Sequence, residues 1–255
     1  MPAPTNPFKK ALKEGKTQIG CWVSLANPYT TEMMGTAGFD WLLIDNEHSP
    51  NDLRSTMQQL QVLEASDSHV IVRVPLGETW IIKQMLDAGA QSILVPMVES
   101  AEQARELVRD VTYPPKGRRG VGYSLARASR FSGIPDYGQT ADAEICLLVQ
   151  VENRAGLAAL DEILAVEGID GVFIGPADLA ADMGHMGDMH HPDVQKAIMD
   201  AIRRIRAAGK APGILATQEG MTKDAFDAGA QFVAVGADSL LLVGAARALA
   251  QKWMG

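Results

Sequence analysis

The chain has few cysteines, no excess of basic residues and no long apolar run. Its two cysteines, Cys21 and Cys146, each lie inside an apolar stretch, which suits buried packing better than a disulfide framework. The formal net charge of −8 argues against nucleic acid or an anionic membrane as a partner. No stretch approaches the ~20 apolar residues that span a bilayer, and the N-terminal segment has no signal-peptide core. We therefore expect a cytoplasmic protein.

Several common catalytic signatures are also missing. The sequence has no GxSxG elbow and no CxxC pair, and Gly120-Val121-Gly122 does not open a strand–turn–helix unit. None of the lysines falls inside an expected strand or at the C-terminal end of one, and Lys210 precedes a strand. A Schiff-base mechanism needs a desolvated lysine in the pocket and is therefore disfavoured.

What is present is a regular alternation of apolar strands and amphipathic helices. The chain has 255 residues, of which 47% are hydrophobic, and this suits one α/β domain covering residues 1–255. Strands are expected at 18–25, 41–45, 69–74, 92–97, 145–151, 171–174, 211–215 and 232–236. Helices are expected at 6–14, 27–37, 51–65, 79–88, 100–111, 153–166, 192–208, 218–228 and 239–253. A long Gly-, Arg- and Ser-rich segment, 112–143, interrupts the alternation and suggests a functional loop.

An internal repeat supports this division of the chain. AGFDWLLI, AGAQSILV, EGIDGVFI and AGAQFVAV begin at Ala37, Ala88, Glu167 and Ala228. Each repeat contains a helix end, a glycine suited to the left-handed position after it, and an apolar strand. The recurrence predicts a (β/α)8 TIM barrel in a single domain. An open doubly wound sheet is the second choice.

The stretch WLLIDNEHSP, residues 41–50, carries the first chemical signal. Four apolar residues are followed directly by Asp45, Glu47 and His48. This pattern is typical of a buried strand whose C-terminal end opens into the mouth of the barrel, the rim formed by the C-terminal strand ends. Active sites of such barrels lie at the C-terminal strand ends. His48 is a candidate base that Asp45 is near enough to orient, although a strand that merely reaches solvent remains an alternative.

Other polar residues follow later strands and should face the same mouth. Arg73 lies at the third strand, Gln150 and Glu152 at the fifth, and Asp178 after the sixth. Two carboxylates converging there suit a hard divalent cation such as Mg²⁺ or Mn²⁺. The alternative is that both carboxylates cap the helices that follow them, and that Arg73 forms an ion pair with a rim carboxylate.

The segment after the sixth strand holds two further features. Gly175-Pro176-Ala177-Asp178 resembles a helix start whose free backbone N–H groups suit a carboxylate or a phosphate. A loop then follows with His185, His190 and His191. We interpret this loop as solvated, with its methionines packing against the loop. The sequence shows no second cluster of metal ligands that could complete a site with these histidines.

Together these stretches resemble the HpcH/HpaI aldolase family, and 4-hydroxy-2-oxoheptanedioate aldolases in particular. The resemblance covers nearly the whole chain and rests on WLLIDNEHSPND, LVPMVES, YPPKGRRGVGYSLARASRF, LVQVEN, GVFIGPADLAADMG, GKAPGIL and FVAVG. It implies Glu152 and Asp178 as metal ligands, His48 with Asp45 as a base dyad, and Arg73 on the ketone oxygen. It also implies that the pocket for the pyruvyl group and its surroundings are lined by Gln150, Pro176, Ala177, Trp22 and Leu215.

The resemblance further implies a class II pyruvate aldolase on a (β/α)8 barrel. Such an enzyme cleaves 4-hydroxy-2-oxo acids to pyruvate and an aldehyde such as succinate semialdehyde, as in the breakdown of aromatic compounds. It uses Mg²⁺, Mn²⁺ or Co²⁺. The assembly implied is a homohexamer, a trimer of dimers that swap their C-terminal helices, with RRGVGYSLARASRF at the subunit interface. An aldolase for 2-dehydro-3-deoxy-sugar acids on the same site is the alternative.

One residue departs from the pattern, and two rival functions remain at this point. Asn46 stands where relatives often have glycine, but asparagine tolerates left-handed backbone well. A lyase for acyl-CoA esters would need a basic groove, which the acidic chain does not suggest. A binding protein that kept only the barrel is disfavoured because a base, an arginine and two carboxylates occur together.

Overall fold

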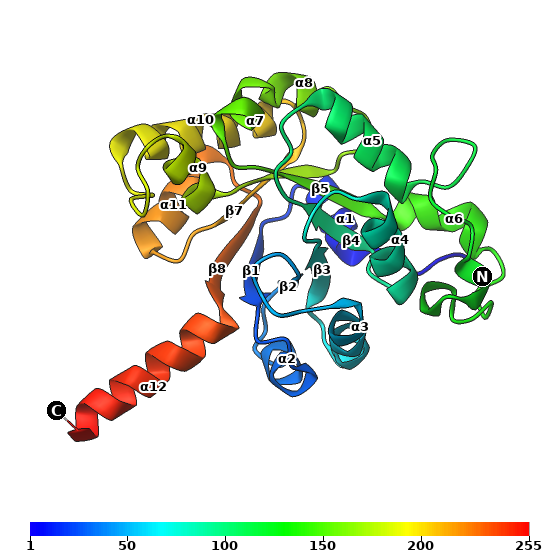
Figure 1. Ribbon diagram of the computed structural model, residues 1–255, viewed down its shortest axis with the longest axis horizontal. Helices are drawn as coiled ribbons and strands as arrows, with labels where there is room; N and C mark the ends of the chain where they lie inside the picture. The colour runs from blue at the N-terminus through cyan, green and yellow to red at the C-terminus, as the bar shows by residue number, and fades with distance from the viewer. Residues whose placement is uncertain (255) are drawn as a thin grey trace.

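The computed structural model describes residues 1–254, in which eight parallel strands form a closed barrel (Figure 1). Each strand pairs with the next one in sequence, and β8 pairs with β1 to close the barrel. The expected (β/α)8 architecture is therefore confirmed. The strands are β1 (Gln18–Val23), β2 (Trp41–Asp45), β3 (His69–Arg73), β4 (Ser92–Val95), β5 (Cys146–Val151), β6 (Gly171–Ile174), β7 (Ala211–Leu215) and β8 (Phe232–Ala237).

Helices surround the barrel, and most begin and end near the expected residues. Two regions differ. The helix expected at 153–166 is two short helices, because the backbone at Ala159 (φ −86°, ψ 1°) leaves the helical geometry. The segment after β6 is already helical from Pro176, whose fixed φ suits a first helical turn. The helices are α1 (Pro7–Lys13), α2 (Pro28–Gly35), α3 (Leu53–Val62), α4 (Thr79–Ala88), α5 (Ala101–Val111), α6 (Tyr137–Glu144), α7 (Arg154–Ala158), α8 (Leu160–Leu164), α9 (Pro176–Asp182), α10 (Pro192–Ala207), α11 (Glu219–Ala228) and α12 (Asp238–Met254).

The repeated helix–strand joint has the geometry that its sequence predicts. Gly38, Gly89, Gly168 and Gly229 all have positive φ, between +85° and +110°. A side chain at these positions would be strained, whereas glycine adopts this conformation freely. The four joints therefore turn each helix end into the following strand and set the spacing of the barrel.

The barrel interior is filled by side chains, and one short helix, α1, closes the end at which the strands begin. Trp41, Phe173 and Phe232 are buried inside the barrel, and Phe8 of α1 packs against Trp41 and Phe232 at ring-centroid distances of 6.2 and 5.7 Å. Because α1 occupies the end where the strands begin, only the C-terminal strand ends remain available for a site. A larger apolar layer lies between the strands and the outer helices.

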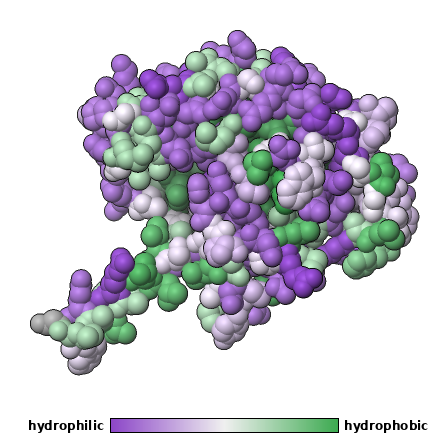
Figure 2. All heavy atoms as spheres, in the orientation of Figure 1, coloured by the Kyte–Doolittle hydropathy of each residue, from purple (hydrophilic) through white to green (hydrophobic). Residues whose placement is uncertain are grey.

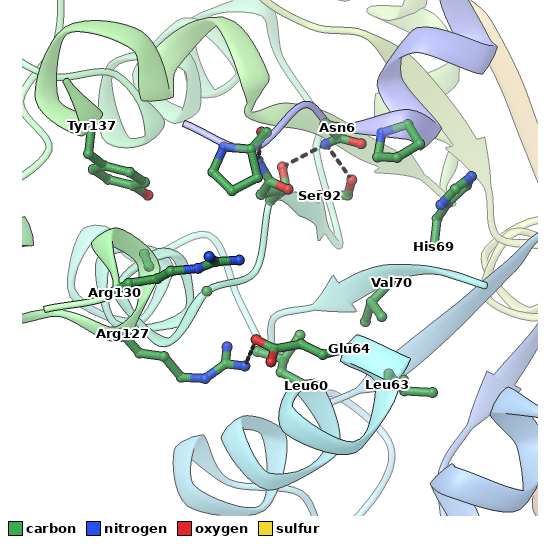
Figure 3. A pocket seen from close by; sticks show the side chains of 15 residues that line it. Asn6, Leu60, Leu63, Glu64, His69, Val70, Ser92, Arg127, Arg130 and Tyr137 are labelled. Carbon is green, nitrogen blue, oxygen red and sulfur yellow. Dashed lines mark hydrogen bonds and ion pairs between the residues drawn. The ribbon is translucent and has the colours of Figure 1, made fainter. Parts of the chain in front are cut away.

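The long segment 112–143 is more ordered than expected. It contains two short 3-10 turns, Tyr123–Leu125 and Arg127–Ser129, and the start of α6. Tyr113, Ile134 and Tyr137 form a small cluster of their own. A cavity of about 380 Å³ separates part of this segment from the barrel (Figure 3). Its lining includes His69 and Ser92, the first residues of β3 and β4, so it lies at the opposite end from the expected active site.

The last helix, α12, leaves the barrel and projects away from it (Figure 1). Asp238 fixes its start, accepting hydrogen bonds from the Ser24 N–H at 2.8 Å and the Leu25 N–H at 3.2 Å. Beyond this turn the helix exposes apolar side chains, seen in green where it leaves the barrel in Figure 2. They are Leu240, Leu241, Leu242, Val243, Leu249 and Trp253. None of the helices within residues 1–254 has the length and apolar character to cross a membrane.

We expect Gly20→Ala to destabilise the barrel, since an added methyl carbon would lie 2.1 Å from the Trp41 ring. Overpacking of this kind costs about 1–3 kcal/mol, or a fall in Tm of roughly 2–12 °C for a domain of this size. Gly236→Ala is the matched control on β8, because its methyl would meet only Cys21 Sγ at 3.7 Å. Thermal unfolding at one protein concentration measures both changes, and equal Tm values would contradict the packing argument.

Candidate active site

Arg73 and Asp45 form the buried centre of the mouth. The parallel register places them side by side on β3 and β2. Arg73 Nε donates to Asp45 Oδ1 at 2.8 Å, and Nη2 donates to Oδ2 at 2.9 Å. The guanidinium also lies over the Trp22 ring, 4.7 Å from its centroid. These contacts fix the orientation of the cation.

Glu47 is the third member of this ion cluster. Its Oε2 lies 2.7 Å from Arg73 Nη1, although this contact lacks the alignment of a hydrogen bond. Burial raises the pKa of Glu47, Arg73 opposes this shift, and the nearby Glu152 adds to it. Sequence reasoning had placed Glu47 at the mouth without giving it a role.

His48 lies at the rim and is largely exposed. Its Nε2 is 3.8 Å from Glu47 Oε1. The sequence suggested that Asp45 orients this imidazole, but in the described residues Asp45 directs both carboxylate oxygens to Arg73 and Oδ1 also to the Glu47 N–H. A guanidinium offers two charge-assisted bonds and therefore outcompetes a neutral imidazole for the carboxylate. The structure thus brings His48 next to Glu47 instead of Asp45.

Glu152 and Gln150 project from β5 toward the same mouth. Alternate residues of a strand share a face, so both side chains are buried together. Gln150 Nε2 donates to Glu152 Oε2, and the Met97 N–H donates to Oε1 at 2.8 Å. Burial raises the pKa of Glu152; the two hydrogen bonds oppose the shift, and Asp178 adds to it.

Met97 is a contributor that the sequence did not reveal. Its backbone has φ +55°, an uncommon conformation for a residue with a side chain. This geometry directs its N–H toward Glu152. No composition or spacing signal distinguishes Met97 from an ordinary residue after a strand.

Asp178 lies in the first turn of α9, where its carboxylate is exposed. The capping alternative fails for both carboxylates within residues 1–254. Gly175 occupies the N-cap of α9 without any side-chain cap, while Asn153 caps the helix after Glu152 by accepting the Gly156 N–H at 2.8 Å. Neither Glu152 nor Asp178 is therefore engaged in ending or starting a helix.

The remaining expected residues surround this group. Pro176 is buried and begins α9, and Ala177 beside it is exposed. Trp22 packs under Arg73 and against Phe173, with ring centroids 5.6 Å apart. Leu215, half-buried at the end of β7, borders the aromatic interior of the barrel.

The charge balance of the mouth favours a cation. Asp45, Glu47, Glu152 and Asp178 supply four carboxylates around one guanidinium, that of Arg73. Gly175 leaves room for the Glu152 carboxylate, because a Cβ at this position would lie 2.4 Å from Oε2. Gln150 Oε1 is buried without a hydrogen-bond partner. An oxygen-only donor set with excess negative charge suits a hard divalent ion, so the residues fit a Mg²⁺-type centre.

Comparisons with known proteins agree with this geometry. Residues 18–245 match the model of the family described as HpcH/HpaI aldolase/citrate lyase. A hydroxypyruvate/pyruvate aldolase from Roseobacter denitrificans is 62% identical over 253 residues, covering 99% of each chain. A 4-hydroxy-2-oxo-heptane-1,7-dioate aldolase from Escherichia coli is 53% identical over 248 residues, covering 97% of this chain and 95% of the relative.

A solved structure shows the same architecture. The crystal structure of an HpcH/HpaI aldolase/citrate lyase family protein from Burkholderia cenocepacia has a TM-score of 0.94 and 38% identity. The match covers 98% of this chain and 100% of that one. This chain therefore belongs to the HpcH/HpaI aldolase/citrate lyase family and is a carbon–carbon lyase of the aldolase kind.

Proposed function

We propose that this chain is a metal-dependent, class II aldolase that cleaves 4-hydroxy-2-oxo acids to pyruvate and an aldehyde, and catalyses the reverse addition. The observation that carries this proposal is that Arg73, His48, Glu152 and Asp178 lie at one barrel mouth, where no lysine within residues 1–254 forms an ion pair with them. A substrate such as 4-hydroxy-2-oxoheptanedioate would give pyruvate and succinate semialdehyde. Relatives at 56–62% identity are named hydroxypyruvate/pyruvate aldolases, so we include hydroxypyruvate as a donor.

Glu152 and Asp178 would hold the metal ion, with Mg²⁺, Mn²⁺ or Co²⁺ as the candidates. When bound, such an ion supplies Lewis-acid stabilisation of the negative charge that develops on the ketone oxygen. Burial is the largest cause of the raised pKa of Glu152, and a cation bound beside this carboxylate would oppose that shift.

Arg73 would share the task of stabilising charge on the C2 oxygen. Its guanidinium is held by Asp45, Glu47 and Trp22, so little reorganisation is needed when the charge develops. The backbone at Pro176–Ala177 and the amide of Gln150 would seat the substrate carboxylate. Trp22 and Leu215 would border the pyruvyl and aldehyde ends.

His48 would act as the base. It accepts the proton of the C4 hydroxyl as the C3–C4 bond breaks, the C4 oxygen becomes the aldehyde, and the bonding electrons pass to the enolate of pyruvate. The proton is then available to C3 of the enolate, which completes pyruvate. Glu47 Oε1 lies 3.8 Å from Nε2 of this imidazole, so we assign Glu47 the orienting part that the sequence had suggested for Asp45.

The direct test measures the pyruvate that the chain releases from 4-hydroxy-2-oxo acids. A coupled reductase assay detects the pyruvate, and the assay is run with and without chelator. A panel of succinate semialdehyde, tartronate semialdehyde and lactaldehyde, each offered with pyruvate or hydroxypyruvate, then ranks the aldehydes. Activity that survives complete chelation, or a borohydride-trapped pyruvyl adduct on a lysine, would overturn the proposal.

The exposed last helix supports assembly into oligomers, and we propose the homohexamer that the family resemblance implies. An isolated helix of 17 residues is marginal in water unless its apolar face is packed. The side chains of α12 leave a large apolar surface exposed. A helix that is swapped between two subunits exposes such a surface when a single subunit is viewed alone. We therefore expect α12 to pack on the barrel of a second copy.

We first predict how Glu152→Gln changes stability in chelator. The pKa of Glu152 is raised above the ordinary value of 4.5, so its protonated form stabilises the metal-free fold at low pH. This contribution is lost as the pH rises through the raised pKa. The variant keeps a neutral side chain, so its Tm should exceed that of the wild type increasingly as the pH rises above 4.5, until the raised pKa of Glu152 is passed.

Adding Mg²⁺ should raise the Tm of the wild type and leave Glu152→Gln unchanged, because the variant lacks the anionic ligand. Glu162→Gln on α8, an exposed position, is the control and should behave as the wild type. A Glu152→Gln variant that follows the pH profile of the wild type in chelator would show that Glu152 titrates normally.

A second prediction separates His48 from Arg73. Aldol cleavage needs a base for the C4 hydroxyl, whereas decarboxylation of oxaloacetate forms the same enolate without one. His48→Ala should lower aldol cleavage by roughly 10²–10⁴ and keep most decarboxylation. Arg73→Ala should lower both by about 10²–10³, with Arg73→Lys as the variant that retains the buried charge. His190→Ala is the control imidazole, and an equal loss of both reactions in His48→Ala would refute the base assignment.

A third prediction concerns assembly. Light scattering at low micromolar concentration should give a mass well above the 27.3 kDa of one chain. Leu241→Glu combined with Leu249→Glu should lower that mass, because charges would replace the apolar surface of α12. Gln251→Glu on the same helix should not. A fully active monomeric wild type would contradict the swapped-helix arrangement.

A further inference from the structure

The loop between α9 and α10 gathers three metal-ligating side chains outside the barrel mouth. His185, His191 and Asp193 each offer a ligand atom, and these atoms lie within 4.8 Å of one another. The sequence had drawn attention to the histidines but not to Asp193, which lies in the first turn of α10. The Asp193 carboxylate is thus a third candidate ligand, which comes from α10 and not from the loop that carries the histidines.

The two imidazoles are held face to face. Their ring centroids are 3.5 Å apart and their planes are inclined by 15°. Imidazole nitrogens ligate through lone pairs that lie in the ring plane, so one ring must turn out of this stack before both nitrogens can face one ion. His191 Nδ1 also lies 3.9 Å from Asp193 Oδ2, so a nitrogen and a carboxylate oxygen already face each other.

The loop that carries these residues is ordered by its own contacts. The His185 N–H donates to Ala180 O at 2.8 Å, and the Asp188 N–H donates to His185 O at 2.9 Å. Gln195 Nε2 donates to Met189 O at 2.7 Å, and Met189 packs against the main core. The ligands are therefore presented by a built loop that joins two helices.

We propose that His185, His191 and Asp193 form a second divalent-metal site of transition-metal type, separate from the oxygen-lined mouth. Two imidazoles and one carboxylate suit Cu²⁺, Ni²⁺ or Zn²⁺ and leave positions for water. Ligand atoms around a tetrahedral ion are about 3.3 Å apart, so the side chains need only to rotate and close by about an ångström. The His191 Nδ1 bond to the Asp193 N–H, 3.2 Å long, is given up if that nitrogen ligates.

The site would connect two elements that differ in function. The α9 helix begins with the turn that carries Asp178, and the loop leaves its other end only a few residues later. The α10 helix packs on the outside of the barrel through Val194, Ile198 and Ile202. An ion bound between His185 and Asp193 would tie the C-terminal end of α9 to this packed helix.

The experiment uses the full chain without a polyhistidine tag, in saturating Mg²⁺, and titrates it with Cu²⁺. Electron paramagnetic resonance distinguishes nitrogen from oxygen ligands through hyperfine splitting, and His48→Ala serves as the background so that the mouth offers no imidazole. We expect one Cu²⁺ per chain with two nitrogen ligands. His185→Ala should weaken binding at least roughly tenfold, the lower end of what even indirect ligand contacts contribute.

Two further variants distinguish ligation from general effects of the loop. His191→Asn removes the imidazole but keeps a good helix cap, and it too should weaken binding and lose one nitrogen from the spectrum. His190→Ala removes an adjacent exposed histidine that lies outside the cluster, and it should bind as the parent does. Unchanged binding in His185→Ala and His191→Asn would overturn the proposal, as would an equal loss in His190→Ala.

Discussion

The buried pairing of Arg73 with Asp45 is the interaction on which the barrel mouth depends. A guanidinium removed from water is stable only if its donors are met in good geometry, and removing one partner of such a pair is far more costly than never burying it. Register supplies the partner, because adjacent parallel strands place Asp45 and Arg73 side by side. Trp22 covers one face of the cation. The guanidinium of Arg73 is therefore positioned by the strands of the barrel.

The same pairing explains why the mouth is suited to a cation. Asp45 and Glu47 already use the single positive charge of Arg73, so Glu152 and Asp178 across the mouth are left without a counter-ion. Glu152 responds with a raised pKa, and Gln150 and the Met97 N–H offset part of the burial cost. An ion held by Glu152 and Asp178 would therefore remove repulsion as well as polarise a substrate, which links the electrostatics of the resting site to the proposed chemistry.

The sequence predicts what depends on local pattern and misses what depends on contacts across the barrel. The four left-handed glycines and the apolar runs were sufficient to predict eight strands and their closure, and the parallel topology placed Arg73, Gln150 and Glu152 at one end. The partner of Asp45 could not be derived this way, because the choice between His48 and Arg73 is decided by side-chain geometry between two strands. The N–H of Met97 is a comparable case, since a backbone group carries no sequence signal. The helix start at Gly175-Pro176 could be recognised from the sequence, but the extent of α9 to Asp182 could not.

The two cation sites would differ in donor chemistry, and that difference decides whether they can coexist. The mouth offers Glu152 and Asp178, oxygen donors that suit Mg²⁺, whereas His185 and His191 offer nitrogen, which Mg²⁺ binds poorly and Cu²⁺, Ni²⁺ or Zn²⁺ bind well. Divalent transition metals generally bind nitrogen and oxygen sites more tightly than Mg²⁺ does, so a chain with only the mouth would be open to replacement of its ion. A nitrogen-rich site at the far end of α9 would bind such a metal more tightly than an oxygen-only site does. The two sites would then take different ions, Mg²⁺ at the mouth and a transition metal at the histidine loop.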